Sequence, residues 1–386
     1  MRSATCAPQH APSSDTATDS TPQAISATKA ARRAAFGAVL VCALLVGVAS
    51  LLGWLGGDRL AHFLGARAEV LALASGYLRL VFLYFGFTAG LNILSAIMHG
   101  SGETRTPMRA ILLVNVLHVL IAYPLVYGYL GLPSLGVTGA AIAINASEAV
   151  GFLYLLEEAL RRRFIRIGRP DREHLGKILR VGWPTALERI AQQSGQLFYS
   201  KFIIGYGTAA YAAHQIGLSI ESLSFMPGAG MGIAAATLMG QALGARKVQR
   251  ARIGHREALR LAVLVMGGMA LLFLAAPQLL MGLFTHDPEV VAKGCVFLRL
   301  VAFAQVPLAL SFVYAGSLRG TGDTFYVFLV TLAVMWGVRV LLSWVASDLL
   351  QLSLYAVWGI FVLDWYARAA LFAWRYHRRD LHSVLL

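Results

Sequence analysis

Charged side chains are scarce in this chain of 386 residues, at 13% against 58% hydrophobic residues. A soluble domain carries roughly 25% charged residues, so the composition excludes a water-exposed globular fold. A helix that crosses a bilayer needs about 20 mostly apolar residues, which gives the chain room for about ten spans. We therefore predict an all-α, polytopic membrane protein.

Cysteine is also rare, and the three residues present, Cys6, Cys42 and Cys295, show neither C-x-x-C nor Cys/His spacing. This pattern predicts no disulfide framework and no metal site. The chain has no H-E-x-x-H, G-x-S-x-G or Walker motif, which argues against an enzyme and against direct use of ATP. We expect a protein that is not an enzyme and carries no cofactor.

Long apolar segments dominate what remains. Ten of them have the length of a membrane span, at about 34–55, 72–98, 108–129, 136–157, 179–204, 208–240, 260–284, 293–317, 325–347 and 352–374. The residues before the first segment are rich in Ser, Thr, Ala and Pro and lack the apolar core of about 7 to 15 residues that a secretory signal needs. We expect a disordered tail over 1–33.

Arginine and lysine gather in alternate loops, most densely over 161–172 and 246–256. Positive charges close to membrane spans stay on the cytoplasmic side, so both termini are predicted to be cytoplasmic in an inner or plasma membrane. The net charge of +14 follows from these loops. It therefore does not indicate a nucleic-acid partner.

The chain contains an internal repeat. The segment HGSGET at 99–104 reappears as RGTGDT at 319–324, a shift of 320 − 100 = 220 positions. Without a gap, the same shift places LRLV at 78–81 on LRLV at 298–301. Because each Gly-x-Gly-acid-Thr segment follows one span and opens the next, its glycines suit a tight turn and its acid and Thr suit a helix start. As a signal for phosphate binding it is weak, since it follows a helix and lacks the Walker lysine.

The two halves of the repeat are unequal. Subtracting 220 from the segments at 179–240 reaches the polar tail, so these spans have no counterpart upstream. The predicted domains are the tail at 1–33, an incomplete first lobe of four helices at 34–160, a basic cytoplasmic linker at 161–178, a second lobe of six helices at 179–377 and a cytoplasmic tail at 378–386.

Several motifs resemble one membrane-protein family. The runs AAHQI at 212–216, SFMPG at 224–228 and LMGQALGA at 238–245 are similar to the eighth-helix signature of the multidrug and toxic compound extrusion (MATE) family. The GWP run at 182–184 with Glu188, the paired turns, GVTGAA at 136–141 and Asp364-Trp365 with Arg368 also look like that family. The likeness covers about 34–380 and implies two lobes around a central cavity, with this chain holding helices three to twelve of twelve.

The resemblance also implies a function. MATE proteins are secondary active antiporters that export amphiphilic or cationic small molecules, such as drugs, toxins and metabolites, in exchange for H+ or Na+ by alternating access. The expected partners are a small-molecule substrate and the lipid bilayer; we expect a monomer, with a partner chain that completes the first lobe as an open alternative. Two other functions stay open: a flippase for lipid-linked substrates of the same superfamily, and a transport-inactive truncated remnant.

Polar residues recur at helical spacing on one face of the segment at 179–204: Glu188, Gln192, Gln196 and Tyr199. They follow Pro184, which is expected to start or kink the helix and to serve as a hinge. A carboxylate beside amides within the membrane suits cation coupling next to a substrate cavity. The alternative is a structural pair between Glu188 and Arg180 or Arg189.

The next segment places His214 and Glu221 on one face, and both join the candidate cavity. The alternatives are a structural role for His214 and a hydrogen bond within the lobe for Glu221. Pro227, Gly228 and Gly230 should then weaken the helix and form a second hinge.

The last candidates are an ion-pair network and a glutamine. Asp364 and Arg368 lie four residues apart and, with Arg339, are predicted to form a structural ion pair. Some MATE branches carry an acid in the tenth helix, but the matching segment here offers Gln305 beside Pro307. Since the family's acid in the first helix has no equivalent either, we favour Glu188 as the coupling residue.

Overall fold

The structure of the chain, a computed structural model, describes residues 36–37, 39–56, 68–129, 133–162, 164 and 172–381. Within these ranges every regular element is a helix. The first lobe contains the helix Val39–Gly56, α2 (Ala68–Gly100), α3 (Arg105–Tyr127) and α4 (Gly136–Arg161). The second contains α5 (Arg172–Ile204), α6 (Thr208–Gly244), α7 (Val248–Ala275), α8 (Pro277–Gly282), α9 (Pro288–Gly320), α10 (Thr324–Ala333), the π-helix η1 (Val334–Val340), α11 (Leu341–Trp344), the π-helix η2 (Val345–Leu349) and α12 (Leu354–Arg378).

Nine helices in the described ranges are long and apolar enough to cross a membrane, with α10 to η2 counted as one span over Thr324–Leu349. The exception among the long helices is α5, which carries charged residues at Lys177, Arg180, Glu188, Arg189 and Lys201. The predicted ten spans therefore correspond to ten helical segments, of which one is too polar to qualify on composition. The prediction of an all-α, multi-pass membrane protein is confirmed.

Two helices begin well before the apolar segments predicted for them, by 179 − 172 = 7 and 260 − 248 = 12 residues. Helix α5 begins at Arg172, inside the predicted linker at 161–178, and α7 begins at Val248, ahead of the predicted span at 260–284. Both extensions are polar and basic, so a hydropathy criterion does not detect them. The predicted tail at 1–33 lies outside the described residues, as do residues 382–386 of the predicted tail at 378–386.

The internal repeat is reproduced in the backbone. Helices α2 and α9 have 33 residues each, and both their first and last residues differ by 220 positions. The turn that follows is the same in both lobes: Gly102 has a φ of +87° and Gly322 a φ of +82°, a left-handed conformation that favours glycine. In each turn the acid's backbone N–H donates to the residue five positions earlier, over 2.9 Å from Glu103 N to Met98 O and 2.9 Å from Asp323 N to Leu318 O.

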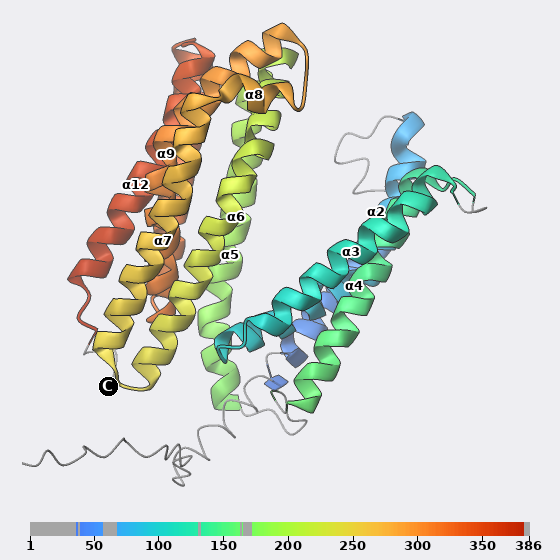
Figure 1. Cartoon of the computed structure of the whole chain (residues 1–386), viewed down its shortest axis with the longest axis vertical. Coiled ribbons are helices and arrows are strands. Elements are labelled where there is room, and N and C mark those ends of the chain that lie inside the picture. The colour runs from blue at the N-terminus through green and yellow to red at the C-terminus, as the bar shows by residue number, and fades with distance from the viewer. Residues whose placement is uncertain are drawn as a thin grey trace, which may run out of the picture.

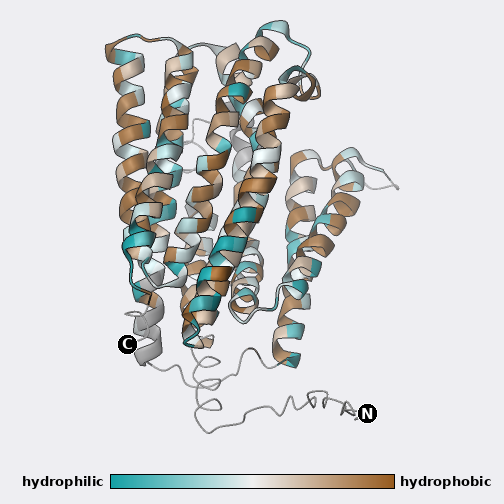
Figure 2. Ribbon diagram, turned by 60° about the vertical axis from the view of Figure 1, so that its left-hand side comes forward, coloured by the Kyte–Doolittle hydropathy of each residue, from teal (hydrophilic) through white to brown (hydrophobic). Residues whose placement is uncertain are grey.

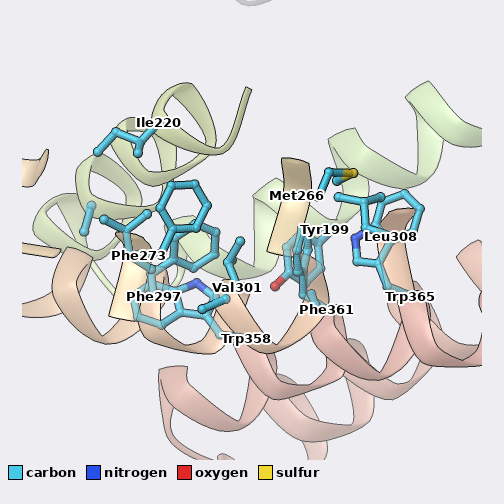
Figure 3. Packing of buried hydrophobic residues seen from close by; sticks show 14 of the residues in the cluster. Tyr199, Ile220, Met266, Phe273, Phe297, Val301, Leu308, Trp358, Phe361 and Trp365 are labelled. Atoms are coloured by element: carbon cyan, nitrogen blue, oxygen red, sulfur yellow. The ribbon is translucent and has the colours of Figure 1, made fainter. Parts of the chain in front are cut away.

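The core of the second lobe forms around α9, which packs against α6, α7 and α12. Figure 3 shows its centre, where Phe297 lies beside Trp358, and Tyr199 lies beside Phe361. In the most apolar 18-residue window of α9, 61% of the residues are buried, whereas the value for α2 in the first lobe is 11%. The second lobe therefore has an interior in which polar groups can be shielded from lipid.

Glycines bring α6 and α9 into backbone contact. A Cβ atom on Gly316 would collide with the carbonyl group of Gly232, and one on Gly320 would lie 2.5 Å from the carbonyl oxygen of Ala236. From the other side, a Cβ on Gly232 would lie 2.8 Å from the carbonyl oxygen of Phe312. Small residues permit this approach, as is common between membrane helices.

The two lobes diverge. In Figure 1 the ribbons of α2, α3 and α4 lean away from the second lobe toward the top and approach it at the bottom, where α2 contacts α6. At that end the Nε2 atom of Gln241 in α6 donates to the carbonyl oxygen of Gly100 over 3.2 Å, and the same amide lies against Gly102. Figure 2 shows apolar residues along most of the helices and hydrophilic residues gathered near this end. Within the described residues, the repeat turn of the first lobe is thus a place where the lobes touch.

Candidate functional site

Glu188 is held in an ion pair inside the second lobe. Its Oε1 atom lies 2.6 Å from Nη2 of Arg319, and the glutamate side chain is only 12% exposed. Thr331 of α10 lies at the limit of a hydrogen bond, with 3.5 Å from Oγ1 to the same carboxylate oxygen. The partners suggested from the sequence for a structural pair, Arg180 or Arg189, are wrong, because Arg319 makes the contact. Arg319 lies at the end of α9, just before the repeat turn. The next helix, α10, packs against α5, which carries Glu188.

Asp364 of α12 is shared by two buried arginines. Its Oδ2 atom lies 2.6 Å from Nη2 of Arg339 and 3.0 Å from Nε of Arg368, and all three residues are at most 3% exposed. The Arg339 guanidinium also lies 4.3 Å from the ring centre of Phe361, where a cation–π attraction adds to the ion pair. These three residues form the predicted network.

The π-helix η1 places Arg339 in this network. A π-helical turn contains more residues than an α-turn, so it rotates the following side chains relative to a regular helix. Arg339 reaches the interior from η1, between α5 and α12. Buried charged side chains at such an irregular segment are typical of functional sites.

The polar face of α5 docks onto the arginines. Gln192 Oε1 accepts from Nη1 of Arg368 over 2.8 Å, and Gln196 Oε1 accepts from Nη1 of Arg339 over 3.3 Å. Tyr199 is fully buried and donates to the carbonyl oxygen of Val357 over 3.2 Å. The structure thus brings all four predicted residues of this face into one lobe, where they line the Asp364 network rather than an open surface.

A second polar row runs along α6. His214, Gly217, Glu221 and Ser224 are all buried on the face toward α9. The Ser224 hydroxyl donates to Oε1 of Gln305 over 2.6 Å, while Nε2 of Gln305 has no partner within the described residues. Both ring nitrogens of His214 are also without a partner there, and the ring packs edge-on against Phe297. These groups join the α5 face in a single polar interior.

The predicted hinges lie within continuous helices. Helix α5 runs through Pro184, and α6 runs through Pro227, Gly228 and Gly230 without a break. A Cβ atom on Gly228 would contact Met266 and Phe312, so this glycine permits close packing, whereas Gly230 is exposed. Bending at these positions stays a prediction.

Several site residues escaped sequence reasoning. Arg319 stands out in the sequence only as part of the repeat and Ser224 only as part of the SFMPG run, while Thr331 and Met335 carry no recognisable signal. Met335 lies 3.4 Å through its Sδ atom from Nη2 of Arg368 and packs against Gly195. The sequence feature that points to Arg319 is its position at the end of α9, the helix that repeats α2. Glu188 of α5 is the acid that it meets in space.

The arrangement holds several fixed charges in the interior of the second lobe. No group of three or more His, Cys, Asp or Glu side chains suited to a metal ion occurs among the residues that the structure covers. Buried carboxylates and arginines at membrane depth are expensive, so such groups occur mostly in ion and substrate pathways.

Comparison with known proteins identifies the family. The MatE family profile matches residues 20–124 and 184–345. The chain is 31% identical over 314 residues to the probable multidrug resistance protein NorM of Thermotoga maritima, covering 80% of this chain and 68% of that protein. It is 29% identical to the probable multidrug resistance protein NorM of Rhizobium meliloti, covering 82% and 70% of the two chains.

Solved structures share the fold. An outward-facing multidrug resistance MATE family transporter of the MOP superfamily superposes with a TM-score of 0.85 at 22% identity, covering 93% of this chain and 80% of that one. A MOP superfamily transporter from Pyrococcus furiosus, described as having a binding pocket of reversed polarity, gives a TM-score of 0.85 at 21% identity, with coverage of 92% and 80%. With the family profile spread over both lobes, the chain belongs to the MatE family of multi-pass membrane transporters.

Proposed function

We propose that the chain is a secondary active antiporter that exports amphiphilic or cationic small molecules in exchange for H+ or Na+. The observation that supports this most directly is the polar interior of the second lobe, where carboxylates and guanidinium groups are buried inside helices that span the membrane. Since ionisable groups cost several kcal/mol in hydrocarbon, roughly 2.5–3.5 kcal/mol even on insertion scales, such an interior needs a functional reason.

Relatives named multidrug resistance proteins support the export of drugs. The candidate coupling and substrate residues are those of the polar interior: Glu188, Gln192, Gln196, Tyr199, His214, Glu221 and Gln305. The proposed location is the inner or plasma membrane, with both termini in the cytoplasm. In this orientation the lobes touch at the cytoplasmic end and diverge toward the outside.

A dye-accumulation assay tests the proposal. The chain is expressed in a host without its own efflux pumps, and intracellular ethidium is followed by fluorescence. We expect lower accumulation than in cells with an empty vector, and a rise when a protonophore or removal of Na+ abolishes the relevant gradient. Glu257→Gln on the exposed side of α7 is a matched control that should leave export unchanged.

Unchanged dye levels at verified membrane expression would contradict this proposal and favour the transport-inactive alternative. Topology is tested separately by labelling single cysteines with a membrane-impermeant thiol reagent in intact cells. Protection of a cysteine at exposed Arg256 and reaction of one at Leu283, at the other end of the lobe, are expected.

A further inference from the structure

Glu221 occupies a singular position in the second lobe. It lies on the buried face of α6, between Gly217 and Ser224, and is 4% exposed. This face is turned toward α9, since Gly217 packs against Phe297 and Ser224 bonds to Gln305. A carboxyl group is thereby placed in the centre of the lobe rather than at its lipid surface.

Glu221 differs from the other interior acids because no partner fixes it. Asp364 is shared by Arg339 and Arg368, and Glu188 is paired with Arg319. Glu221 makes no hydrogen bond or ion pair with any residue in the described ranges. An ionised carboxylate without a direct partner is costly at this depth, and a bound proton removes the cost.

The polar atoms left over around this region are mainly donors. Nε2 of Gln305, Nε of Arg339, Nε1 of Trp365 and both ring nitrogens of His214 are buried and unpartnered within the described part of the chain. All of these are donors except one nitrogen of the neutral imidazole. Hard metal cations such as Na+ require several oxygen ligands, and surplus N–H groups repel them. Surplus donors instead stabilise a carboxylate, directly or through water, until a proton neutralises it.

The charged and titratable neighbours come from several elements. Arg339 of η1 acts electrostatically on Glu221, and Glu221 and Asp364 of α12 both act on Tyr199 of α5. His214 lies on α6 itself. The residues that α9 and α7 place along this face of α6, Phe297, Gln305 and Met266, do not titrate. With Glu221 ionised, the two arginines balance Asp364 and Glu221; with Glu221 protonated, this cluster carries one positive charge.

We infer that Glu221 is the exchangeable proton-binding group of the second lobe. Protonation forms one O–H bond on the carboxyl group and raises the charge of the buried cluster by one. A cationic substrate then meets an additional positive charge, so proton binding and substrate binding oppose each other. Release of the proton restores the neutral cluster. The link to export rests on the proposed antiport, whereas the protonation itself does not.

Infrared difference spectroscopy of the purified full chain in detergent tests the protonation directly. On acidification, wild type should gain a carbonyl-stretch band from a buried protonated carboxyl group. Glu221→Gln should lose this band, whereas Glu188→Gln should retain it. A band that persists in Glu221→Gln, or that disappears in Glu188→Gln, would overturn the inference.

Two further measurements keep the test decisive. If Glu221→Gln elutes as aggregate, Glu221→Asp takes its place and should shift the band rather than abolish it; an unshifted band contradicts the assignment. Ethidium affinity of wild type should fall on acidification, approaching about tenfold per pH unit for exchange of one proton. Glu221→Gln should show no such dependence, and a retained dependence would argue against Glu221. The proposed export fails independently if wild type shows the band but no efflux from cells.

Discussion

Helices α2 and α9 have the same length and end in the same turn, yet they occupy different surroundings. Helix α9 is enclosed by α6, α7 and α12, whereas α2 packs mainly against α4. The position of Ala304, fully buried in α9, corresponds by the repeat to Tyr84 in α2, which is 41% exposed. A repeated backbone therefore does not imply a repeated interior.

The chemistry of the two interiors differs accordingly. The described part of the first lobe contains aromatic packing, such as Phe87 against Phe152, and a half-buried contact in which Thr88 donates to Glu148. The second lobe contains the Asp364 network and the unpartnered groups of α6. Only an enclosed lobe can shield several charges from lipid, which is why the proposed coupling chemistry lies on one side of the molecule.

Removing the shared acid of the second lobe should have the largest effect. Asp364→Asn leaves two buried guanidinium groups without a counter-charge, so a loss of roughly 3–5 kcal/mol in the free energy of unfolding is expected. Glu148→Gln in the first lobe leaves an acceptor for the Thr88 hydroxyl but removes the negative charge that strengthens the bond, and should cost about 1 kcal/mol. Thermal unfolding in detergent, followed by tryptophan fluorescence, measures the stability of Asp364→Asn and Glu148→Gln, with Asp348→Asn at an exposed position as the control. Equal losses of stability in the first two variants would contradict the difference between the two lobe interiors.

The Glu188–Arg319 pair should show the next largest effect. A double-mutant cycle with Glu188→Gln and Arg319→Gln is expected to give a coupling energy of about 1 kcal/mol, because the arginine is 35% exposed. The position that corresponds to Arg319 in the first lobe is His99. His99→Gln combined with Glu188→Gln should give purely additive losses of stability, and coupling there would show that the lobes communicate through these helix ends.

The two repeat turns should respond differently to the same change. Gly102→Ala and Gly322→Ala each place a side chain at a left-handed φ, which costs roughly 1–2 kcal/mol. A Cβ atom on Gly102 also lies 2.9 Å from Nε2 of Gln241 in the other lobe, whereas one on Gly322 has open space. The distribution of distances between spin labels on the two lobes should broaden in Gly102→Ala and not in Gly322→Ala. Identical distributions in both variants would indicate that the contact between Gly102 and Gln241 does not hold the lobes together.

The smallest predicted effect is that of low pH on Glu103, in the repeat turn of the first lobe. A hydrogen bond from the backbone N–H of Thr106, 3.1 Å from Oε1, lowers the pKa of Glu103 below its usual 4.5, and the N–H of Arg105 and the charge of Arg162 act in the same direction. A lowered pKa in the folded state means that this cap stabilises the turn above about pH 4.5 and is lost as the pH falls through the folded value. The protection of the Thr106 amide relative to its intrinsic exchange rate should fall over that range in wild type, while Glu103→Gln should show low protection that does not change with this titration.

The sequence was sufficient for the helices and the repeat because both depend on local patterns. Apolar runs of spanning length located the helices, and the ungapped shift of 220 positions located the repeated turn. The polar face of α5 was also visible as helical spacing. Each of these features requires only residues that are near one another in the chain or related by the duplication.

Partners across the lobe could not be predicted. Glu188 bonds to a residue 131 positions away, and the choice of Arg319 over neighbouring Arg189 depends on where α9 ends in space. The π-helical turn that orients Arg339 has no pattern in the hydropathy. Helix extensions at Arg172 and Val248 are polar, so they were invisible to a criterion based on membrane burial.

The glycine contacts between α6 and α9 bear on how the molecule can move. Because the backbones touch at Gly232, Gly316 and Gly320, neither helix can slide or rotate past the other without a collision. Any bend at Pro227 must therefore carry the facing stretch of α9 with it, including Gln305 beneath Ser224. A conformational change in this lobe would move α6 and α9 together. It would therefore change the surroundings of Glu221 and the contact of Gln241 with the first lobe at the same time.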